Sequence, residues 1–159
     1  MQDKMTLPEY VIAPQHGISL EVAEKIRKYH LFPMNLIRNQ LGHPIIVSKN
    51  SGYRHPIYEE LQSRRDSTHE FRKIPTRQDP GYGAADYTVA PAVFYKFMQL
   101  LTDADIYNRL IFYPDNGFVH GDYRFLGVDR FYYVVHRGQL LQVTKSELLD
   151  SVWRRYVGN

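Results

Sequence analysis

Apolar residues recur at helical spacing near the start of the chain, which predicts two consecutive helices. The first covers residues 19–30, where Ser19 stands in the N-cap position, and the second covers 33–42, where Gly42 stands just past the last turn. Similar periodicity predicts three further helices: a short one after Pro56, one at 91–106, and one at 144–157 that opens with the capping-box pair Thr144 and Glu147.

Short runs of β-branched and aromatic residues, bounded by turn signals, predict strands mainly in the second half of the chain. Residues 66–82 have no periodicity and are expected to form a long loop. Because helices come mostly first and strands mostly later, the expected fold class is α+β, with N-terminal helices packed on a small antiparallel sheet. The predicted strands fall at 45–48, 85–90, 109–114 and 117–125, with a hairpin at 130–143.

The length of 159 residues suits a single domain spanning 1–159, and 43% hydrophobic residues are enough for a core. No cysteine is present, which excludes disulfides, thiolate metal sites and cysteine nucleophiles. The first residues contain no apolar segment typical of a signal peptide, and no run of about eighteen apolar residues exists, so we expect no membrane partner. The net charge of +3 comes without a dense basic tract, so we expect no nucleic-acid partner.

Polar residues on the predicted strand at 117–125 are the first candidates for a functional site. Alternate residues of a strand share a face, so His120, Asp122 and Arg124 are expected to point the same way. A histidine, an aspartate and an arginine are costly to bury together, which favours a cleft over a dry core.

Two more candidates come from either side of the expected loop. His69 stands near its start, and Asp86 follows a stretch of small residues. Two imidazoles and one carboxylate, with water in the fourth position, are typical of a catalytic zinc site. The spacing alone leaves another interpretation open, in which these residues are an exposed loop histidine, a turn acid and a hydrogen-bonded pair within a sheet.

Four sequence blocks then occur in a fixed order: SGYR at 51–54, STH at 67–69, GAAD at 83–86 and FVHGDYR at 118–124. In this order they resemble the zinc D-alanyl-D-alanine carboxypeptidase family of peptidases, especially its short members in bacteria and phages. The resemblance covers residues 6–125, and the remaining residues 126–159 are the predicted hairpin and C-terminal helix.

The resemblance implies a peptidase that uses Zn²⁺ to cleave stem or cross-link peptides of peptidoglycan. His69 and Asp86 match the first two zinc ligands, and His120 matches the histidine of the late strand and is expected to be the third. Asp122 is then the general base or a partner of a ligand. In a second assignment Asp122 binds the metal and His120 assists. We favour His120 as the ligand because neutral imidazole is the better zinc ligand.

Two more residues receive roles from the same resemblance. Arg54 matches the arginine that holds the substrate carbonyl or carboxylate, and Ser67 matches a substrate-contacting serine. Arg54 could instead brace its own turn through hydrogen bonds. The small excess of positive charge suits an anionic wall polymer. Without a signal peptide, the expected setting is a phage lysis or virion-associated enzyme that is cytoplasmic as synthesised.

The chain departs from the family at three points. His69 and Asp86 are 17 positions apart, compared with about seven in the family, so an inserted loop is expected at 70–82. Tyr82 stands in place of a family glycine, and Gly117 stands in place of a glutamate that precedes the late histidine. The 17-position separation and Tyr82 favour an alternative function, a non-catalytic structural or binding module such as a virion-associated protein.

The remaining histidines and one charged segment are assigned to ordinary structural roles. The charges of residues 58–67 are expected to form a solvated helix face. The sequence leaves open which peptide bond is cleaved and the oligomeric state. The histidines expected at the surface or in packing are His16, His30, His43, His55 and His136.

Overall fold

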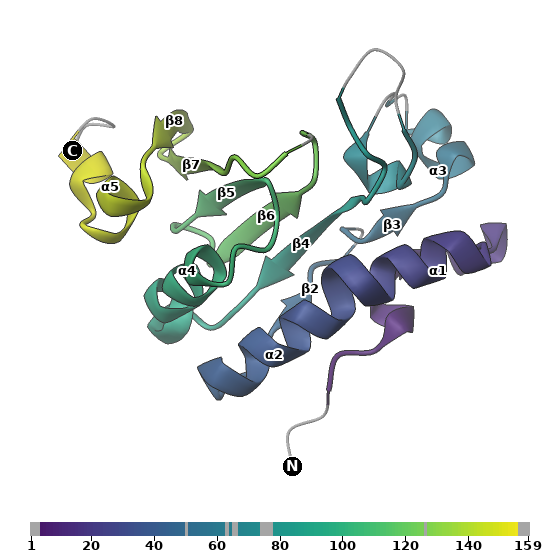
Figure 1. Cartoon of the computed structure of the whole chain (residues 1–159), viewed down its shortest axis with the longest axis horizontal. Helices are drawn as coiled ribbons and strands as arrows, with labels where there is room; N and C mark the ends of the chain where they lie inside the picture. The colour runs from purple at the N-terminus through teal and green to yellow at the C-terminus, as the bar shows by residue number, and fades with distance from the viewer. Residues whose placement is uncertain are drawn as a thin grey trace.

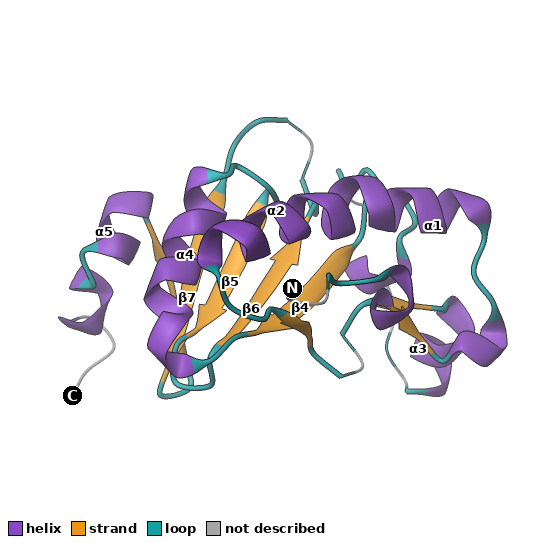
Figure 2. Cartoon of the chain, turned by 90° about the horizontal axis from the view of Figure 1, so that it is seen from below, coloured by secondary structure: helices purple, strands orange, loops and turns teal. Residues whose placement is uncertain are grey.

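A six-stranded sheet with helices across one of its faces makes up most of the protein, which we describe from a computed structural model (Figures 1 and 2). The structure describes residues 4–49, 51–62, 64, 67–73, 78–125 and 127–155, and of residues 152 and 155 it describes the backbone only. Within these ranges no helix is both long enough and apolar enough to cross a membrane.

The strands confirm the α+β class expected from the sequence. The order in the main sheet is β2-β4-β6-β5-β7-β8, and all neighbours are antiparallel except β5 and β7, which are parallel. The parallel pair was not expected; it arises because the chain crosses over after β6 and places β7 on the free side of β5. The main-sheet strands are β2 (Ile46–Val47), β4 (Ala84–Thr88), β5 (Arg109–Tyr113), β6 (Phe118–Asp122), β7 (Phe131–His136) and β8 (Gln139–Val143).

A separate parallel pair of short strands, β1 (Val11–Ile12) and β3 (Tyr53–Arg54), lies beside the main sheet. The α-helices are α1 (Leu20–Ile26), α2 (Phe32–Leu41), α3 (Pro56–Leu61), α4 (Phe94–Asp103) and α5 (Lys145–Leu149). Short helical turns complete the chain: η1 (Leu7–Tyr10), η2 (Pro14–His16), η3 (Arg27–Leu31), η4 (Thr68–Glu70), η5 (Pro91–Val93) and η6 (Val152–Arg155).

The two helices expected at the N-terminus form one continuous rod, because the π-helical turn η3 joins α1 to α2 (Figure 1). Pro33 has no backbone N–H, so it cannot bond the carbonyl of Tyr29 four residues earlier. That carbonyl instead accepts a hydrogen bond of 3.0 Å from the hydroxyl of Tyr123. The predicted caps are confirmed at both ends of the rod, by the Ser19 side chain and by Gly42 in the left-handed conformation.

Burial alternates along β5, and along β6 as far as Gly121, which separates the two faces of the sheet; Asp122, at the end of β6, is buried although it lies on the face of His120. One face is buried and packs in the core with residues of the rod and of α4 (Figure 2). The opposite face of these strands is only half-buried, and it carries His120. The largest core residues on the covered side include Met34, Ile37, Phe97, Leu101, Leu110, Phe112 and Val119.

The C-terminal helix is shorter than predicted. Its capping box forms as expected between Thr144 and Glu147, but α5 ends at Leu149. Ser151 then adopts a left-handed conformation with φ of 56°, which stops an α-helix, and the chain continues as η6. Trp153 in η6 is buried, and residues 156–159 lie outside the described part of the chain.

A one-directional chain of buried hydrogen bonds lies between the rod and the sheet. His30 must donate from Nε2 to the carbonyl oxygen of Tyr82 at 2.8 Å, because a carbonyl only accepts. Its Nδ1 therefore accepts from the hydroxyl of Tyr107 at 2.9 Å, and that oxygen accepts in turn from Tyr87. The hydroxyl of Tyr10 completes the chain at 3.2 Å from Tyr87. The arrangement requires a neutral His30.

The buried state of His30 should make the fold sensitive to acid. Burial lowers the pKa of His30 to about 4, against hydrogen bonding to Tyr82, which raises it. A histidine with a depressed pKa stabilises the fold fully above about pH 6.5 and loses that contribution as the pH falls toward 4, since the unfolded chain takes up the proton first. Between pH 6.5 and pH 4, the free energy of unfolding should fall by about 3 kcal/mol because of His30. The measurement is urea unfolding of zinc-free protein at pH 7 and pH 4.5.

The matched variant is His30→Gln, which keeps one donor and one acceptor but does not titrate. We expect a smaller loss of unfolding free energy between the two pH values in this variant than in the wild type. Equal losses in both proteins would contradict the assignment of a neutral, buried His30.

Candidate metal centre

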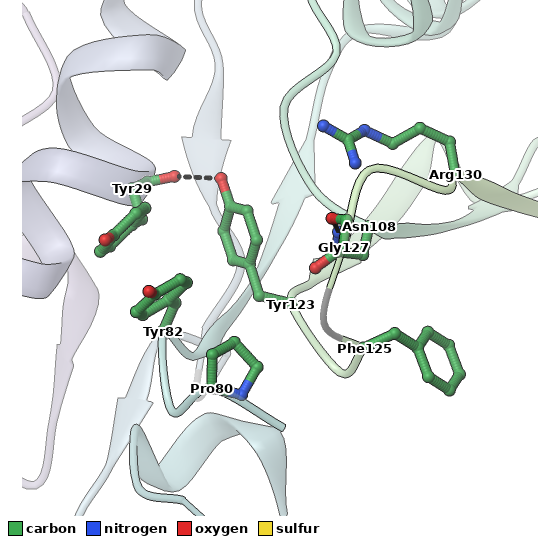
Figure 3. Close-up of a pocket in the computed structure, with 8 residues that line it drawn as sticks. All are labelled: Tyr29, Pro80, Tyr82, Asn108, Tyr123, Phe125, Gly127 and Arg130. Atoms are coloured by element: carbon green, nitrogen blue, oxygen red, sulfur yellow. Dashed lines mark hydrogen bonds between the residues drawn. The ribbon is translucent and has the colours of Figure 1, made fainter. Parts of the chain in front are cut away.

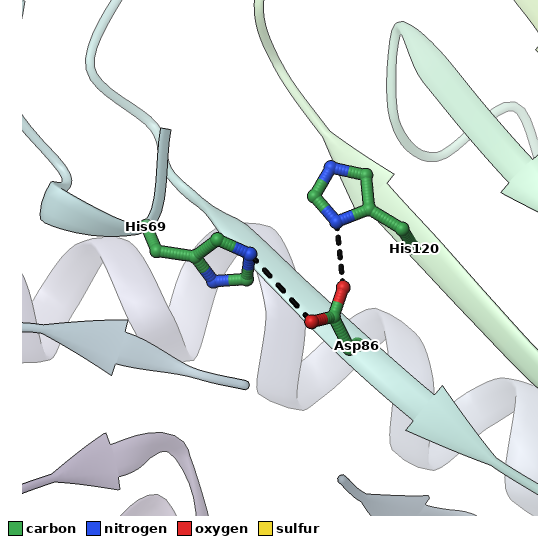
Figure 4. A group of neighbouring side chains, drawn as sticks. All are labelled: His69, Asp86 and His120. Carbon is green, nitrogen blue, oxygen red and sulfur yellow. Dashed lines mark hydrogen bonds and ion pairs between the residues drawn. The ribbon is translucent and has the colours of Figure 1, made fainter. Parts of the chain in front are cut away.

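Three side chains from distant parts of the chain converge on the half-buried face of the sheet (Figure 4). His69, Asp86 and His120 each offer one ligand atom, and these atoms all lie within 4.8 Å of one another. Asp86 is central: its Oδ2 lies 3.7 Å from His69 Nε2, and its Oδ1 lies 2.6 Å from His120 Nδ1. This group could hold a metal ion.

The register between β4 and β6 sets the first of these contacts. Asp86 pairs directly with His120, so both side chains leave the sheet on the same face. On its other side, the backbone of Asp86 donates to the carbonyl of Ser51 and accepts from the N–H of Ser48, both at 2.8 Å. Asp86 is therefore fixed from two sides, with β6 on one and the segment that leads into SGYR on the other.

The SGYR turn also orients His69. The carbonyl of Gly52 accepts a hydrogen bond of 2.9 Å from His69 Nδ1, which leaves Nε2 with its lone pair directed at Asp86. Glycine is required at position 52, because a Cβ there would lie 2.3 Å from the carbonyl oxygen of Tyr10. Ser67 caps the short turn η4 by accepting from the N–H of His69 at 3.2 Å.

The loop that follows His69, expected to be an insertion, leaves His69 beside Asp86 and His120. Phe71, directly after η4, adopts a positive φ of 56° and is 2% exposed. Its ring occupies the space where a Cβ on Gly83 would stand, at 2.3 Å, so the loop is fastened where it leaves the site and where it returns. The insertion expected at 70–82 therefore begins and ends beside the core, and its residues 74–77 lie outside the described part of the chain.

Asp122 lies on the far side of the His120 ring. Its Oδ2 is 2.7 Å from His120 Nε2 and also accepts two hydrogen bonds from the guanidinium of Arg109, one from Nε at 2.9 Å and one from Nη2. Its Oδ1 accepts from the backbone N–H of Arg124 at 3.0 Å. Arg124 was expected on the face of His120 as part of the strand, but β6 ends at Asp122, and the backbone N–H of Arg124 turns to bind Asp122.

The two carboxylates control the charge of His120. Burial alone would lower its pKa, but hydrogen bonds to Asp122 and Asp86 outweigh burial and raise the pKa to about 9. Burial would raise the pKa of Asp122, yet His120 and Arg109 hold it at about 2. Asp86 is likewise kept ionised against burial, mainly by His120. Burial lowers the pKa of His69 to about 3, so this imidazole is neutral and suited to bind a metal.

Arg54 stands beside the metal ligands, with Nη2 4.0 Å from Asp86 Oδ2. It is held by Glu59, whose side chain is 0% exposed and contacts Arg54 Nη1 at 3.2 Å and Arg64 Nε at 3.0 Å. The assignment of the 58–67 charges to a solvated helix face is therefore wrong for Glu59. Helix α3 turns this carboxylate inward, toward the arginine of the SGYR turn.

The structure brings together the ligand residues named from the sequence, and it adds Glu59 and Arg109, for which no sequence pattern was a signal. Glu59 in α3 pairs with Arg54 in β3, and Arg109 in β5 pairs with Asp122 in β6. A local sequence pattern does not show which elements pack together. The remaining histidines lie outside the group: His30 is buried in the core, His55 caps α3, and His136 pairs with Asp115 at 2.8 Å.

A second concave region, of about 260 Å³, lies between η3 and the connection that follows β6 (Figure 3). Tyr29 and Tyr82 stack there with ring centroids 4.0 Å apart, and Tyr123 reaches the helix side of the sheet. None of the candidate metal ligands lines it. The lining residues are Tyr29, Pro80, Tyr82, Asn108, Tyr123, Phe125, Gly127 and Arg130.

Comparison with known proteins adds no relative: no protein-family model, no curated protein and no solved structure matches the chain. The fold and the side chains define an α+β protein with a His/Asp/His group that could bind a metal ion. The peptidase resemblance rests on the four sequence blocks.

We expect the three candidate ligands to be needed together for metal binding. The wild type, loaded with zinc and dialysed, should retain about one zinc per chain, and His69→Ala, Asp86→Ala and His120→Ala should each retain little. Elemental analysis of untagged protein measures this. His136→Ala is the matched control, since this histidine also pairs with an aspartate but lies outside the group. Equal zinc in all four variants, each folded by circular dichroism, would rule out the site.

The buried carboxylate of Glu59 should matter for stability. We expect Glu59→Gln to lower the free energy of unfolding by about 2 kcal/mol, because Arg54 loses its buried partner while Arg64 is solvated enough to adjust. The control is Glu60→Gln, which changes an exposed glutamate on the same helix and should have an effect below about 0.5 kcal/mol. Equal effects of the two variants in urea unfolding would contradict the inward role of Glu59.

Proposed function

We propose that this protein is a zinc-dependent metallopeptidase that hydrolyses peptide bonds of peptidoglycan. The observation that carries the metal assignment is the convergence of His69 Nε2, the Asp86 carboxylate and His120 Nδ1. Two nitrogens and one oxygen suit zinc, and three protein ligands leave a position for water or substrate. The choice of peptidoglycan as substrate rests on the resemblance of the SGYR, STH, GAAD and FVHGDYR blocks to the carboxypeptidase family.

The surroundings of the group fit a metal ion. His69 is held by Gly52 and His120 by Asp122, in the manner in which outer hydrogen bonds orient metal-ligating imidazoles. The His120 side chain keeps 14% of its surface exposed, so the group is reachable from solvent. Bound zinc would supply an activated water and polarise the scissile carbonyl.

Arg54 is the residue proposed to stabilise negative charge on the substrate. Its guanidinium lies beside Asp86 and is anchored by Glu59, so it contributes a fixed positive charge at the edge of the group. Such a charge offsets the negative charge that builds up on the oxygen of the tetrahedral intermediate. Ser67, half-buried at the start of η4, is the proposed substrate contact next to His69.

Asp122 fits the role of a ligand partner better than that of a general base. Both of its oxygens are engaged, by His120, by Arg109 and by the N–H of Arg124, and the residue is 0% exposed. A base must exchange protons with the attacking water. His120 Nδ1 faces Asp86 within the group, so His120, and not Asp122, is the third ligand in this proposal, and zinc would take the place of the proton that Nδ1 shares with Asp86.

The engaged state of Asp122, together with Gly117 in the place of the family glutamate, supports a second candidate function, in which the protein is not a catalyst. In that case the protein keeps the metal group as part of a structural or binding module, such as a virion-associated protein. The two functions differ in one measurable property, which is hydrolysis by the zinc-loaded protein.

We expect the zinc-loaded wild type to release soluble fragments or free D-alanine from purified peptidoglycan, and a chelator to stop the release until zinc is restored. Arg54→Met should lower kcat/KM by about 100-fold while zinc content is kept, because the charge near the substrate is lost, the three ligands are unchanged, and Arg64 still pairs with Glu59. The control is Arg27→Met, which removes an exposed arginine on the rod. Stoichiometric zinc without hydrolysis would overturn the enzyme and support the structural module.

A further inference from the structure

Arg109 lies on the strand next to His120 and is linked to the metal group through Asp122. It pairs directly with Asp122 across β5 and β6, so both side chains leave the sheet on the same face. Its guanidinium donates from both Nε and Nη2 to the single oxygen Asp122 Oδ2. The same oxygen faces His120 Nε2 at 2.7 Å.

The contacts form a line of three residues that ends at the metal group. Arg109 contacts Asp122, Asp122 contacts His120 Nε2, and His120 Nδ1 faces Asp86. The far nitrogen of a metal-bound imidazole normally donates to a carboxylate or carbonyl, which sets the plane of the ring and the tautomer. Asp122 supplies that acceptor, and its own orientation is set by the Arg109 fork and by the N–H of Arg124.

Because Asp122 is buried, only neighbouring protein groups can orient its carboxylate and balance its charge. The residue has no exposed surface, so water does not hold its carboxylate in place. Arg109 keeps 17% of its side chain exposed and, together with His120, balances the buried negative charge of Asp122. A planar guanidinium gives two donors in a fixed geometry, whereas lysine would give one charge without the fork.

We propose that Arg109 is a positioning residue for the metal centre: it fixes Asp122, and through Asp122 it holds His120 with Nδ1 directed at the metal. This inference rests on the zinc site of the proposed function, and not on the peptidase activity. In this inference Asp122 orients the ligand His120, and His120 binds the metal through Nδ1.

The experiment compares zinc affinity among variants by competition with a chromophoric chelator. We expect Arg109→Met to bind zinc about 10- to 100-fold more weakly than the wild type, Asp122→Asn to weaken it similarly, and Arg109→Lys to fall between. Arg130→Met is the matched control, because Arg130 also donates to oxygens at this end of the sheet, namely the carbonyls of Val128 and Asp105, but does not contact Asp122. Its zinc affinity should equal that of the wild type.

A second readout separates positioning from a general loss of structure. With Co²⁺ in place of Zn²⁺, the visible absorption of the ion reports its ligand geometry, and we expect a changed band shape in Arg109→Met but not in Arg130→Met. If Arg109→Met does not fold, Arg109→Lys and Asp122→Asn decide by the same two measurements. Unchanged or tighter zinc binding in the Arg109 and Asp122 variants would overturn the proposal, as would a wild type that binds no zinc.

The outcome is independent of whether the protein is a peptidase. Weakened zinc binding in Arg109→Met, combined with no hydrolysis of peptidoglycan by the wild type, would keep the positioning role and reject the enzyme. Hydrolysis by the wild type with unchanged zinc affinity in Arg109→Met would keep the enzyme and reject the positioning role.

Discussion

The pairing of β4 with β6 is the constraint on which the rest of the site depends. Asp86 stands opposite His120 and Ala84 stands opposite Asp122, so the register decides which carboxylate meets which imidazole. A slip of one residue would send His120 and Asp122 into the apolar core and bring Val119 and Gly121 to the open face. The core opposes that slip, because Val119 is fully buried on the helix side. The ring of Tyr107 opposes it as well, because it lies where a Cβ at position 121 would stand. The packing that stabilises the sheet therefore also positions the candidate metal ligands.

One of the three candidate ligands, His69, comes from outside the sheet and needs its own support. His69 is held between the carbonyl of Gly52 and the capped turn η4, and Phe71 fastens the chain directly after it. This explains how a 17-residue separation between His69 and Asp86 is compatible with a short distance in space. A longer loop costs little closure entropy once both of its ends are packed.

The sequence predicted much of this, and its failures have physical causes. Helical spacing, the capping box at Thr144 and the alternation in β6 are local signals, and each described element they indicated is present. The continuous rod through Pro33 was missed because the carbonyl freed by proline is satisfied by Tyr123, 94 positions away. The inward turn of Glu59 and the fork of Arg109 on Asp122 depend on tertiary packing and strand register, which no local pattern records. His69, Asp86 and His120 could be named because each lies in a short block with a family resemblance, whereas their approach to one another could not be derived from spacing.

The central claim is that these three side chains form one metal site, and diffraction at the zinc absorption edge tests it most directly. Crystals grown from zinc-loaded protein should show one strong anomalous peak about 2.0–2.2 Å from His69 Nε2, an oxygen of Asp86 and His120 Nδ1. A peak at any other position, or none among these residues in crystals that contain zinc, would contradict the account. The same map shows whether Asp122 stays on the Nε2 side of the His120 ring when the metal is bound.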